Sequence, residues 1–340
     1  MFFESMMKKN LKIIMKTKFT LFIFGFTLGG FFYSYVYPPI KSSVKLAFFE
    51  EDSTSLAQKK IVLVLGSGGI RGLAHLGVLE VLEKNKIPIS EIVGCSAGSL
   101  IGAFYAASLD LDFLKDIFLP LKRKDLVDFD LLGLRYGLSS GEAFHHFLDK
   151  NLPVKEFKKL KIPFKIAATD LGSGDGVIIK SGSLIPAILG SSAYPLVYRP
   201  VSWQGRTLVD GGVVNPIPVD EARKLKPDLV IAVNTSIKIK EELPSNLFGV
   251  AKRSMEISHY SKAKESLARA DIVINPDLGV IGTFDEANNY QIYNEGKKAA
   301  ALQIKSILKA LRKTKKINLK AKPFMPLVSF LRGLKIFFNI

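Results

Sequence analysis

The chain has 340 residues, a formal net charge of +17 and a single cysteine. This length allows one large α/β domain with appendages, and one cysteine excludes an intramolecular disulfide. The whole charge excess lies in residues 1–41 and 297–340, because residues 42–296 hold thirty basic and thirty acidic side chains. A nucleic-acid-binding domain normally carries its positive charge on a folded face, so this distribution does not favour one. Basic ends beside apolar segments instead predict contact with an anionic membrane surface.

The first segment combines lysines with an uncharged apolar run. Residues 1–18 are basic, and residues 19–37 contain no charged side chain. A spanning helix needs about 17–20 apolar residues, so residues 19–37 predict a transmembrane anchor; a signal sequence is the alternative. The lysine bias then predicts that the N-terminus lies in the cytoplasm and the following domain on the non-cytoplasmic side. If translation starts at Met7 or Met15 instead of Met1, this argument for the orientation is weaker. Residues 38–58 are predicted to form a linker.

A strand, a glycine-rich turn and a helix come next. The apolar run Ile61–Leu65 predicts a buried parallel strand, and leucines on one face predict a helix over residues 73–84. Between them lies Gly66-Ser67-Gly68-Gly69-Ile70-Arg71-Gly72. Glycines let backbone N–H groups point at a ligand, so this turn is suited to holding an oxyanion.

Two nucleotide-binding motifs fit this turn poorly. After Gly66-x-Gly68, the third glycine of a dinucleotide fingerprint comes one residue late, at Gly72. No acidic residue ends a second strand about twenty residues on, as ribose binding would need. A phosphate-binding loop would end in Gly-Lys-Ser/Thr, whereas this turn ends in Arg71-Gly72-Leu73.

A second strand is predicted over residues 91–95 and a second helix over residues 99–109. Between them lies Gly94-Cys95-Ser96-Ala97-Gly98. A Gly-x-Ser-x-Gly between strand and helix predicts a nucleophile elbow, in which the glycines allow close approach and the serine hydroxyl is exposed. The helix N-terminus beneath it favours developing negative charge. An ordinary glycine-flanked turn is the alternative.

The remaining elements alternate between strand and helix, which predicts a parallel sheet. Residues 110–154 are predicted to be helical with loops, forming either a lid over a substrate or a plain core-covering pair. Further predicted elements are strands at 164–169, 229–234 and 271–274, a hairpin at 172–182, and helices at 247–269 and 299–311. The basic tail, residues 301–340, ends in an apolar stretch that contains two cations, which suits an interfacial helix better than a spanning one.

Two residues are candidate partners for Ser96. Asp210 follows a predicted strand end at residues 207–209 and precedes Gly211 and Gly212. It can therefore project at the carboxyl edge of the sheet, although Asp-Gly-Gly alone also fits a simple turn. Ser96, Asp210 and His259 occur in the Ser…Asp…His order of a hydrolase triad. His259, however, lies within the predicted long helix.

Three blocks together resemble the signature of one family. They are Ser67-Gly68-Gly69-Ile70-Arg71-Gly72, Gly94-Cys95-Ser96-Ala97-Gly98 and Asp210-Gly211-Gly212. They resemble the G-G-G-x-R/K-G, G-x-S-x-G and D-G-G/A blocks of patatin-like phospholipases, with Ser67 standing where that family usually has its first glycine. The similarity covers roughly residues 60–300.

The resemblance implies a three-layer α/β/α catalytic domain with a mainly parallel central sheet over residues 59–300. It implies a lipid acyl hydrolase acting on phospholipid or lysophospholipid through an acyl-enzyme, with no cofactor and no metal. Ser96 would be the nucleophile and Asp210 the general base of a Ser–Asp dyad. The oxyanion would be held by the backbone N–H groups of Gly68, Gly69, Ile70 and Arg71.

An aspartate with a pKa of about 3.9 is a poor base, so burial should raise the pKa of Asp210. A serine esterase or thioesterase with a Ser–Asp–His triad, and a non-catalytic membrane adaptor, remain as alternatives.

Overall fold

The computed structural model describes residues 59–129, 136–239, 241–285 and 288–313. These residues belong to one unit that begins at Lys59. The predicted basic segment, anchor and linker of residues 1–58, and the tail beyond residue 313, lie outside the described residues. Within the part of the chain that is described, no helix is both long and apolar enough to cross a bilayer.

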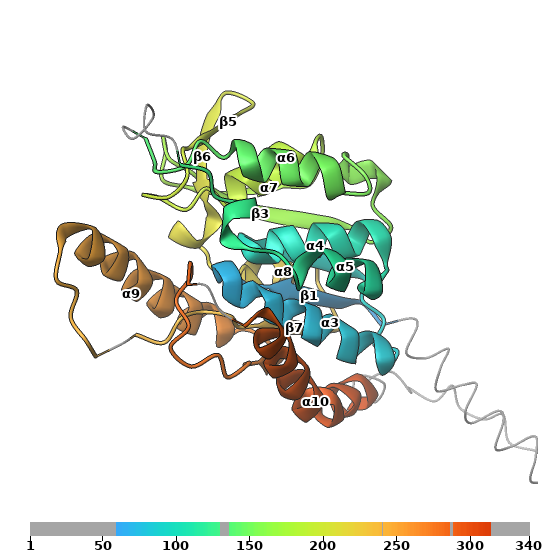
Figure 1. The fold of residues 1–340 in the computed structure, drawn as a ribbon. Helices are drawn as coiled ribbons and strands as arrows, with labels where there is room; N and C mark the ends of the chain where they lie inside the picture. Colours follow the sequence, from blue (N-terminus) through green and yellow to red (C-terminus); the bar gives the residue numbers. More distant parts are fainter. Residues whose placement is uncertain (1–58, 130–135, 240, 286–287, 314–340) are drawn as a thin grey trace, which may run out of the picture. The chain divides into compact units, whose positions relative to one another are not determined.

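An eight-stranded sheet forms the centre of this unit (Figure 1). Its order is β5 (Val201–Trp203), β6 (Arg206–Asp210), β3 (Phe164–Asp170), β2 (Glu91–Cys95), β1 (Ile61–Leu65), β7 (Leu229–Val233) and β8 (Ile272–Ile274), and β4 (Gly176–Ile179) also pairs with β3. The five strands from β3 to β8 in this order are parallel, whereas β4 and β6 run antiparallel to β3. The predicted mainly parallel sheet is confirmed. The strands that run antiparallel lie at the β3 end of the sheet.

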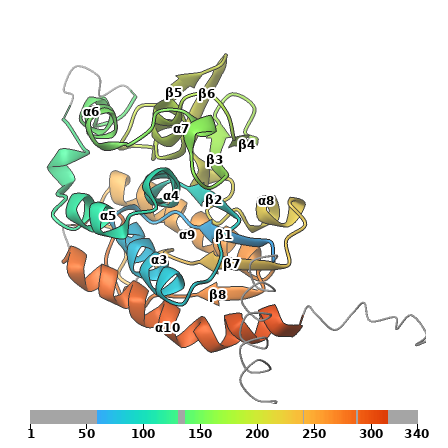
Figure 2. The ribbon, with the colours of Figure 1, turned by 90° about the vertical axis from the view of Figure 1, so that its right-hand side faces the viewer.

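Helices cover both faces of the sheet and complete three layers (Figure 2). One face carries α3 (Ala74–Lys84), α4 (Ala97–Ser108), α5 (Leu111–Phe118) and α10 (Asn289–Lys313), and the other carries α8 (Val219–Lys224) and α9 (Leu247–Leu267). Near β3 and β6, α7 (Leu184–Ser191) packs on the sheet and α6 (Glu142–Asn151) packs on α7. The closing helix α10 begins ten residues earlier than the predicted start at residue 299.

The central strand β1 is buried on both faces. Val62 and Val64 join a core cluster with Ile217 and Ala263, which come from the α8 and α9 side. The alternate residues of β1 point to the opposite face and are equally buried. Burying one Val or Leu side chain contributes about 1.5–3 kcal/mol, so this strand is among the best-anchored parts of the fold. The glycine-rich turn therefore begins from a rigid support.

Candidate active site

Ser96 lies in the sharp turn between β2 and α4. Its backbone has φ 52° and ψ −119°, a conformation that non-glycine residues rarely adopt. The turn is held because Ser96 N–H donates to Ser191 Oγ at 2.8 Å, and Ser99 Oγ donates to the Ser96 carbonyl at 2.7 Å. A Cβ at Gly94 would lie only 2.6 Å from the Gly98 carbonyl oxygen, so the turn needs a glycine there. Strain of this kind, held by its surroundings, is typical of functional sites.

The register of the sheet brings Asp210 to the level of Ser96. Cys95 pairs with Ala167 of β3, and Asp210 pairs with the next residue, Ala168. Ser96 Oγ donates to Asp210 Oδ2 at 2.7 Å. Asp210 reaches this place on β6, an antiparallel strand that returns from beyond the carboxyl edge of the parallel strands. The sequence pattern located the residue at a strand end but not the direction of that strand.

The environment of Asp210 suits a base. The side chain is only 1% exposed, and burial raises its pKa to about 6, although hydrogen bonds from Ser96 and Gly212 act in the opposite direction. The second bond runs from Gly212 N–H to Asp210 Oδ1 at 2.7 Å and fixes the carboxylate plane. At neutral pH Asp210 is therefore mainly ionised, yet it is more basic than an ordinary aspartate.

The glycine-rich turn supplies free backbone donors beside Ser96. Gly68 and Gly69 line a small chamber together with Ser96, and among the described residues their N–H groups donate to no acceptor. Gly69 has φ +56°, and a Cβ there would lie 2.6 Å from Thr283 Cγ2. Of the four predicted oxyanion donors, these two therefore have N–H groups without an acceptor among the described residues.

The other two predicted donors are already paired. Ile70 N–H donates to the Thr283 carbonyl at 3.0 Å, and Arg71 N–H donates to the Gly68 carbonyl at 3.2 Å. The short 3₁₀ helix η1 (Gly69–Leu73) causes the second pairing by turning the chain back on itself. Ala97, the first residue of α4, lines the larger cavity together with Gly69 and Ser96, and its N–H has no acceptor among the described residues, so it is a further candidate donor that was not predicted.

The Arg71 side chain holds the glycine-rich turn in place. Its guanidinium donates to the carbonyl oxygens of Thr235 at 2.9 Å, Ser236 at 2.6 Å and Ile281 at 2.8 Å. Burial lowers the pKa of Arg71 to about 10, so the group stays charged at neutral pH. Its contacts tie η1 to two loops more than 160 residues away in the sequence. This positioning role was not predicted.

His259 lies near the dyad without joining it. Asp210 accepts from Ser96 and Gly212, and His259 Nε2 has no hydrogen-bond partner among the described residues. Burial lowers the pKa of His259 to about 4, so the ring is neutral at pH 7. A triad needs the histidine between serine and aspartate, whereas here serine and aspartate bond directly. The structure does not assemble the alternative triad.

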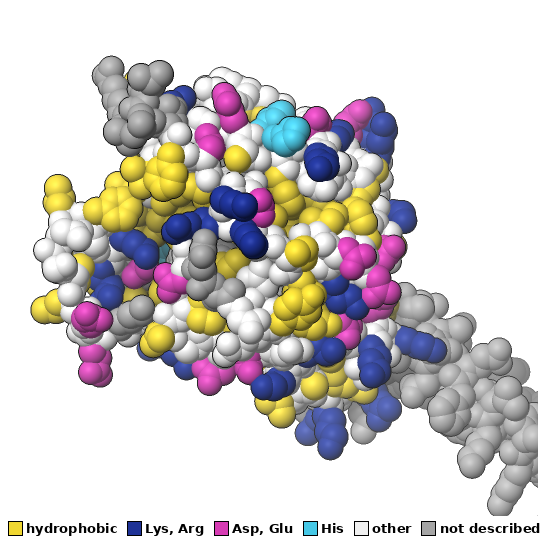
Figure 3. All heavy atoms as spheres, in the orientation of Figure 1, with side chains coloured by type: hydrophobic (Ala, Val, Ile, Leu, Met, Phe, Trp, Pro, Cys, Tyr) yellow, Lys and Arg dark blue, Asp and Glu magenta, His cyan; other side chains and the backbone are white. Residues whose placement is uncertain are grey.

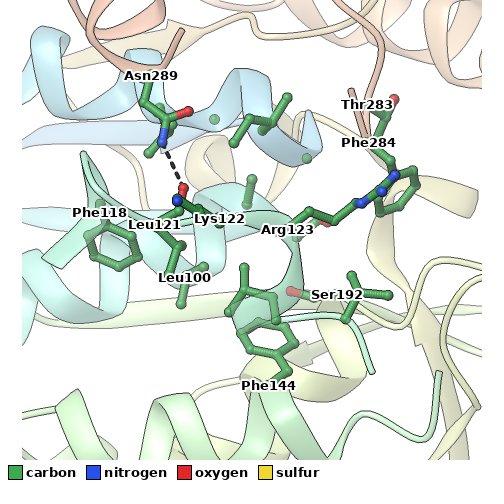
Figure 4. Close-up of a pocket in the computed structure, with 18 of the residues that line it drawn as sticks. Leu100, Phe118, Leu121, Lys122, Arg123, Phe144, Ser192, Thr283, Phe284 and Asn289 are labelled. Carbon is green, nitrogen blue, oxygen red and sulfur yellow. Dashed lines mark hydrogen bonds between the residues drawn. The ribbon is translucent and has the colours of Figure 1, made fainter. Parts of the chain in front are cut away.

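An apolar cavity of about 450 Å³ opens beside Ser96 (Figure 4). This volume is in the usual range for small-molecule sites. Its walls come from α4, the segment at residues 118–127, α6 and the loop before α10, and include Leu100, Ile101, Phe118, Leu121, Phe144 and Phe284. Asn289 Nδ2 holds the 118–127 segment by donating to the carbonyls of Leu119 at 3.0 Å and Leu121 at 2.8 Å. Part of the predicted helical segment at residues 110–154 thus lines a cavity large enough for a substrate.

Across the described ranges, no group of three or more His, Cys, Asp or Glu side chains is placed to hold a metal ion.

Comparison with known proteins gives one consistent family. Residues 63–223 match the family model described as patatin-like phospholipase. An uncharacterized NTE family protein of Mycobacterium tuberculosis is 33% identical over 175 residues, which cover 52% of this chain and 49% of that protein. Human patatin-like phospholipase domain-containing protein 6 is 33% identical over 196 residues, covering 55% of this chain and 14% of that protein.

A third relative carries an activity in its name. Lysophospholipase NTE1 of Scheffersomyces stipitis is 30% identical over 183 residues, covering 53% of this chain and 12% of that protein. The chain thus spans half the length, or less, of these relatives. The family model and the relatives agree with the resemblance of the three glycine-rich blocks, and residues 63–223 carry a patatin-like phospholipase domain.

Proposed function

We propose that this protein is a serine lipid acyl hydrolase of the phospholipase A or lysophospholipase type, working through a Ser96–Asp210 dyad. The hydrogen bond of 2.7 Å between Ser96 Oγ and Asp210 Oδ2 carries the proposal. General-base catalysis needs a contact of about 2.6–3.2 Å. The family match and the lysophospholipase name of one relative support a lipid ester as the substrate.

The first half of the reaction would acylate the serine. Asp210 takes the proton of Ser96 Oγ as this oxygen attacks the ester carbonyl carbon. The N–H groups of Gly68 and Gly69 hold the resulting oxyanion. As the tetrahedral intermediate collapses, Asp210 gives its proton to the departing alcohol oxygen, and the acyl group remains on Ser96. Water then hydrolyses this ester.

The residues that line the cavity support a substrate that has both an acyl chain and a charged headgroup. Most of its wall is aliphatic or aromatic, which suits a hydrocarbon chain. Lys122 and Arg123 also line it and are exposed to solvent. Two cations at the edge of an apolar cavity favour a phosphate-bearing substrate over a neutral ester.

We propose further that the protein acts at a membrane surface, with residues 19–37 as a single-pass anchor and the catalytic domain on the non-cytoplasmic side. The charge and hydropathy of the two ends support this. Exposed apolar side chains at the start of α9 also support it, since Leu247 is 87% exposed and Leu243, just before the helix, is 84% exposed. Figure 3 shows hydrophobic and basic side chains close together on one face of the unit, a combination that suits an anionic bilayer.

The test is fatty-acid release by the full chain from phospholipid, lysophospholipid and p-nitrophenyl esters in mixed micelles. Ser96→Ala should abolish release, and Asp210→Asn should strongly reduce it. The matched controls Ser173→Ala and Asp175→Asn alter exposed residues of the β3–β4 turn and should leave it unchanged. Release that survives Ser96→Ala would refute the proposed function. Binding to vesicles with and without anionic lipid tests the membrane proposal separately.

A further inference from the structure

A second and smaller chamber adjoins the dyad. Its volume is about 30 Å³, and both Ser96 and Asp210 line it. Gly68 and Gly69 form one wall, and residues of other elements form the rest: Tyr194, Ser236, Ile237, Glu256, His259 and Thr283. Polar atoms make up a larger share of its wall than of the wall of the acyl cavity.

Three polar atoms in the chamber wall stand out. Tyr194 Oη, Ser236 Oγ and His259 Nε2 are buried and have no hydrogen-bond partner among the described residues. Buried polar atoms are normally paired with protein or with ordered water. Three such atoms around one chamber therefore point to a small polar ligand that binds there.

The size of the chamber limits that ligand. About 10–15 Å³ of free space is enough for one water molecule, which needs two to four polar partners. The chamber offers this space and these partners. The larger apolar cavity also reaches Ser96 and can take the acyl chain, which leaves the small chamber for the polar ligand.

The chamber wall is fixed relative to the dyad. A Cβ at Gly212 would lie 3.0 Å from His259 Cε1 and 3.3 Å from His259 Nε2, so the ring sits directly on the Asp-Gly-Gly turn. The Tyr194 and His259 rings pack edge to face with centroids 6.0 Å apart. Lys262 Nζ anchors α9 by donating to the Val213 carbonyl at 2.7 Å. The polar atoms are therefore held at a set place beside Asp210.

We propose that this chamber holds the water molecule that hydrolyses the acyl-enzyme, and that Tyr194 and His259 position it. The inference rests on the function proposed above. The water oxygen attacks the carbonyl carbon of the Ser96 ester while one of its protons passes to the Asp210 carboxylate. The N–H groups of Gly68 and Gly69 hold the oxyanion. The bond from carbon to Ser96 Oγ then breaks, the proton returns from Asp210 to this oxygen, and the fatty acid leaves.

This proposal gives His259 a role other than that of a triad base. A neutral imidazole nitrogen can donate to water or accept from it, depending on its tautomer. His259 would orient the water and would take no proton from Ser96. Loss of the ring nitrogen should therefore affect deacylation and leave acylation intact, whereas loss of a triad histidine would impair both steps.

The test compares Tyr194→Phe and His259→Phe with wild-type full chain, using p-nitrophenyl octanoate under rapid mixing. The nitrophenol burst reports acylation, and intact-protein mass spectrometry reports acylated Ser96. Both variants keep an aromatic ring, so packing in the wall is preserved. The controls are Tyr105→Phe, whose hydroxyl contacts Glu83 away from the chamber, and His145→Phe on the exposed face of α6.

In Tyr194→Phe and His259→Phe, we expect the acylation rate constant to stay within about twofold of the wild-type value. The deacylation rate constant should fall by about tenfold or more, which is the effect of losing roughly one positioning interaction. The acyl-enzyme should then accumulate at steady state. Unchanged deacylation in Tyr194→Phe and His259→Phe would overturn the proposal, and so would an equal fall in both steps. If wild type forms no acyl adduct on Ser96, the proposed function itself fails, which is a different outcome.

Discussion

Replacing Asp210 by asparagine should strongly reduce activity and stabilise the fold. The carboxamide has the same shape, and its oxygen can still accept from Gly212 N–H. It cannot take a proton from Ser96, so the loss in kcat/KM should be about 10²–10⁴-fold, the usual contribution of a general base. The remaining activity reports what the oxyanion donors and the cavity achieve without a base.

The stability gain follows from the pKa of Asp210. Its pKa is raised from the ordinary aspartate value of 3.8 to about 6, which means that burial disfavours the ionised form. At about 1.4 kcal/mol per pKa unit, ionised Asp210 costs the folded state on the order of 3 kcal/mol at pH 8. Because the folded pKa is raised, this cost is absent below about pH 4, grows as pH rises from about 4 to 6, and is constant above that. The asparagine side chain does not ionise, so the Asp210→Asn variant does not have this pH-dependent cost.

The assay is urea denaturation of both proteins at pH 5 and pH 8. Asp210→Asn should be the more stable protein at both values, and the difference should be larger at pH 8 by about 1–2 kcal/mol. The exposed change Asp175→Asn controls for a general effect of removing a charge. Activity within tenfold of wild type, or a stability difference that does not depend on pH, would refute this account of Asp210.

Three further predictions follow from the same geometry. The kcat/KM of the wild type should fall as pH drops through about 6, because protonated Asp210 cannot accept the Ser96 proton; a profile flat from pH 5 to 8 would contradict this. Lys122→Ala with Arg123→Ala should lower kcat/KM for a lysophospholipid by about tenfold, roughly one charge-assisted contact, and spare a neutral p-nitrophenyl ester; equal losses on both would argue against headgroup contact. Leu100→Trp should narrow the acyl cavity and shift preference toward shorter acyl chains across an ester series, and an unchanged chain-length profile would show that the chain binds elsewhere.

The sequence was most informative where the pattern is local. A continuous apolar run predicted β1, and the Gly-x-Ser-x-Gly spacing placed Ser96 between a strand and a helix, as the structure shows. The second arm of the hairpin predicted at residues 172–182 is β4, whereas its first arm is β3, which ends earlier, at Asp170. These features depend on neighbouring residues, and so periodicity and turn chemistry were sufficient.

The features that the sequence did not predict depend on distant residues. The direction of β6 is not encoded in its own apolar pattern, and β5 has only three residues. The pairing of Ile70 N–H with Thr283 joins positions more than 200 residues apart. The chamber beside the dyad depends on how α9 packs over the turn at Gly212. These features cannot be predicted from the residue pattern of any single segment.

The central claim is that Ser96 becomes acylated and that Asp210 activates it. The most direct measurement is mass spectrometry of the full chain quenched during turnover of a slowly hydrolysed acyl ester, followed by peptide mapping. The account predicts an acyl adduct on Ser96 in the wild type, a strongly reduced adduct in Asp210→Asn and none in Ser96→Ala, with fatty-acid release falling in parallel. An adduct on another residue, or ester hydrolysis that persists in Ser96→Ala, would contradict it.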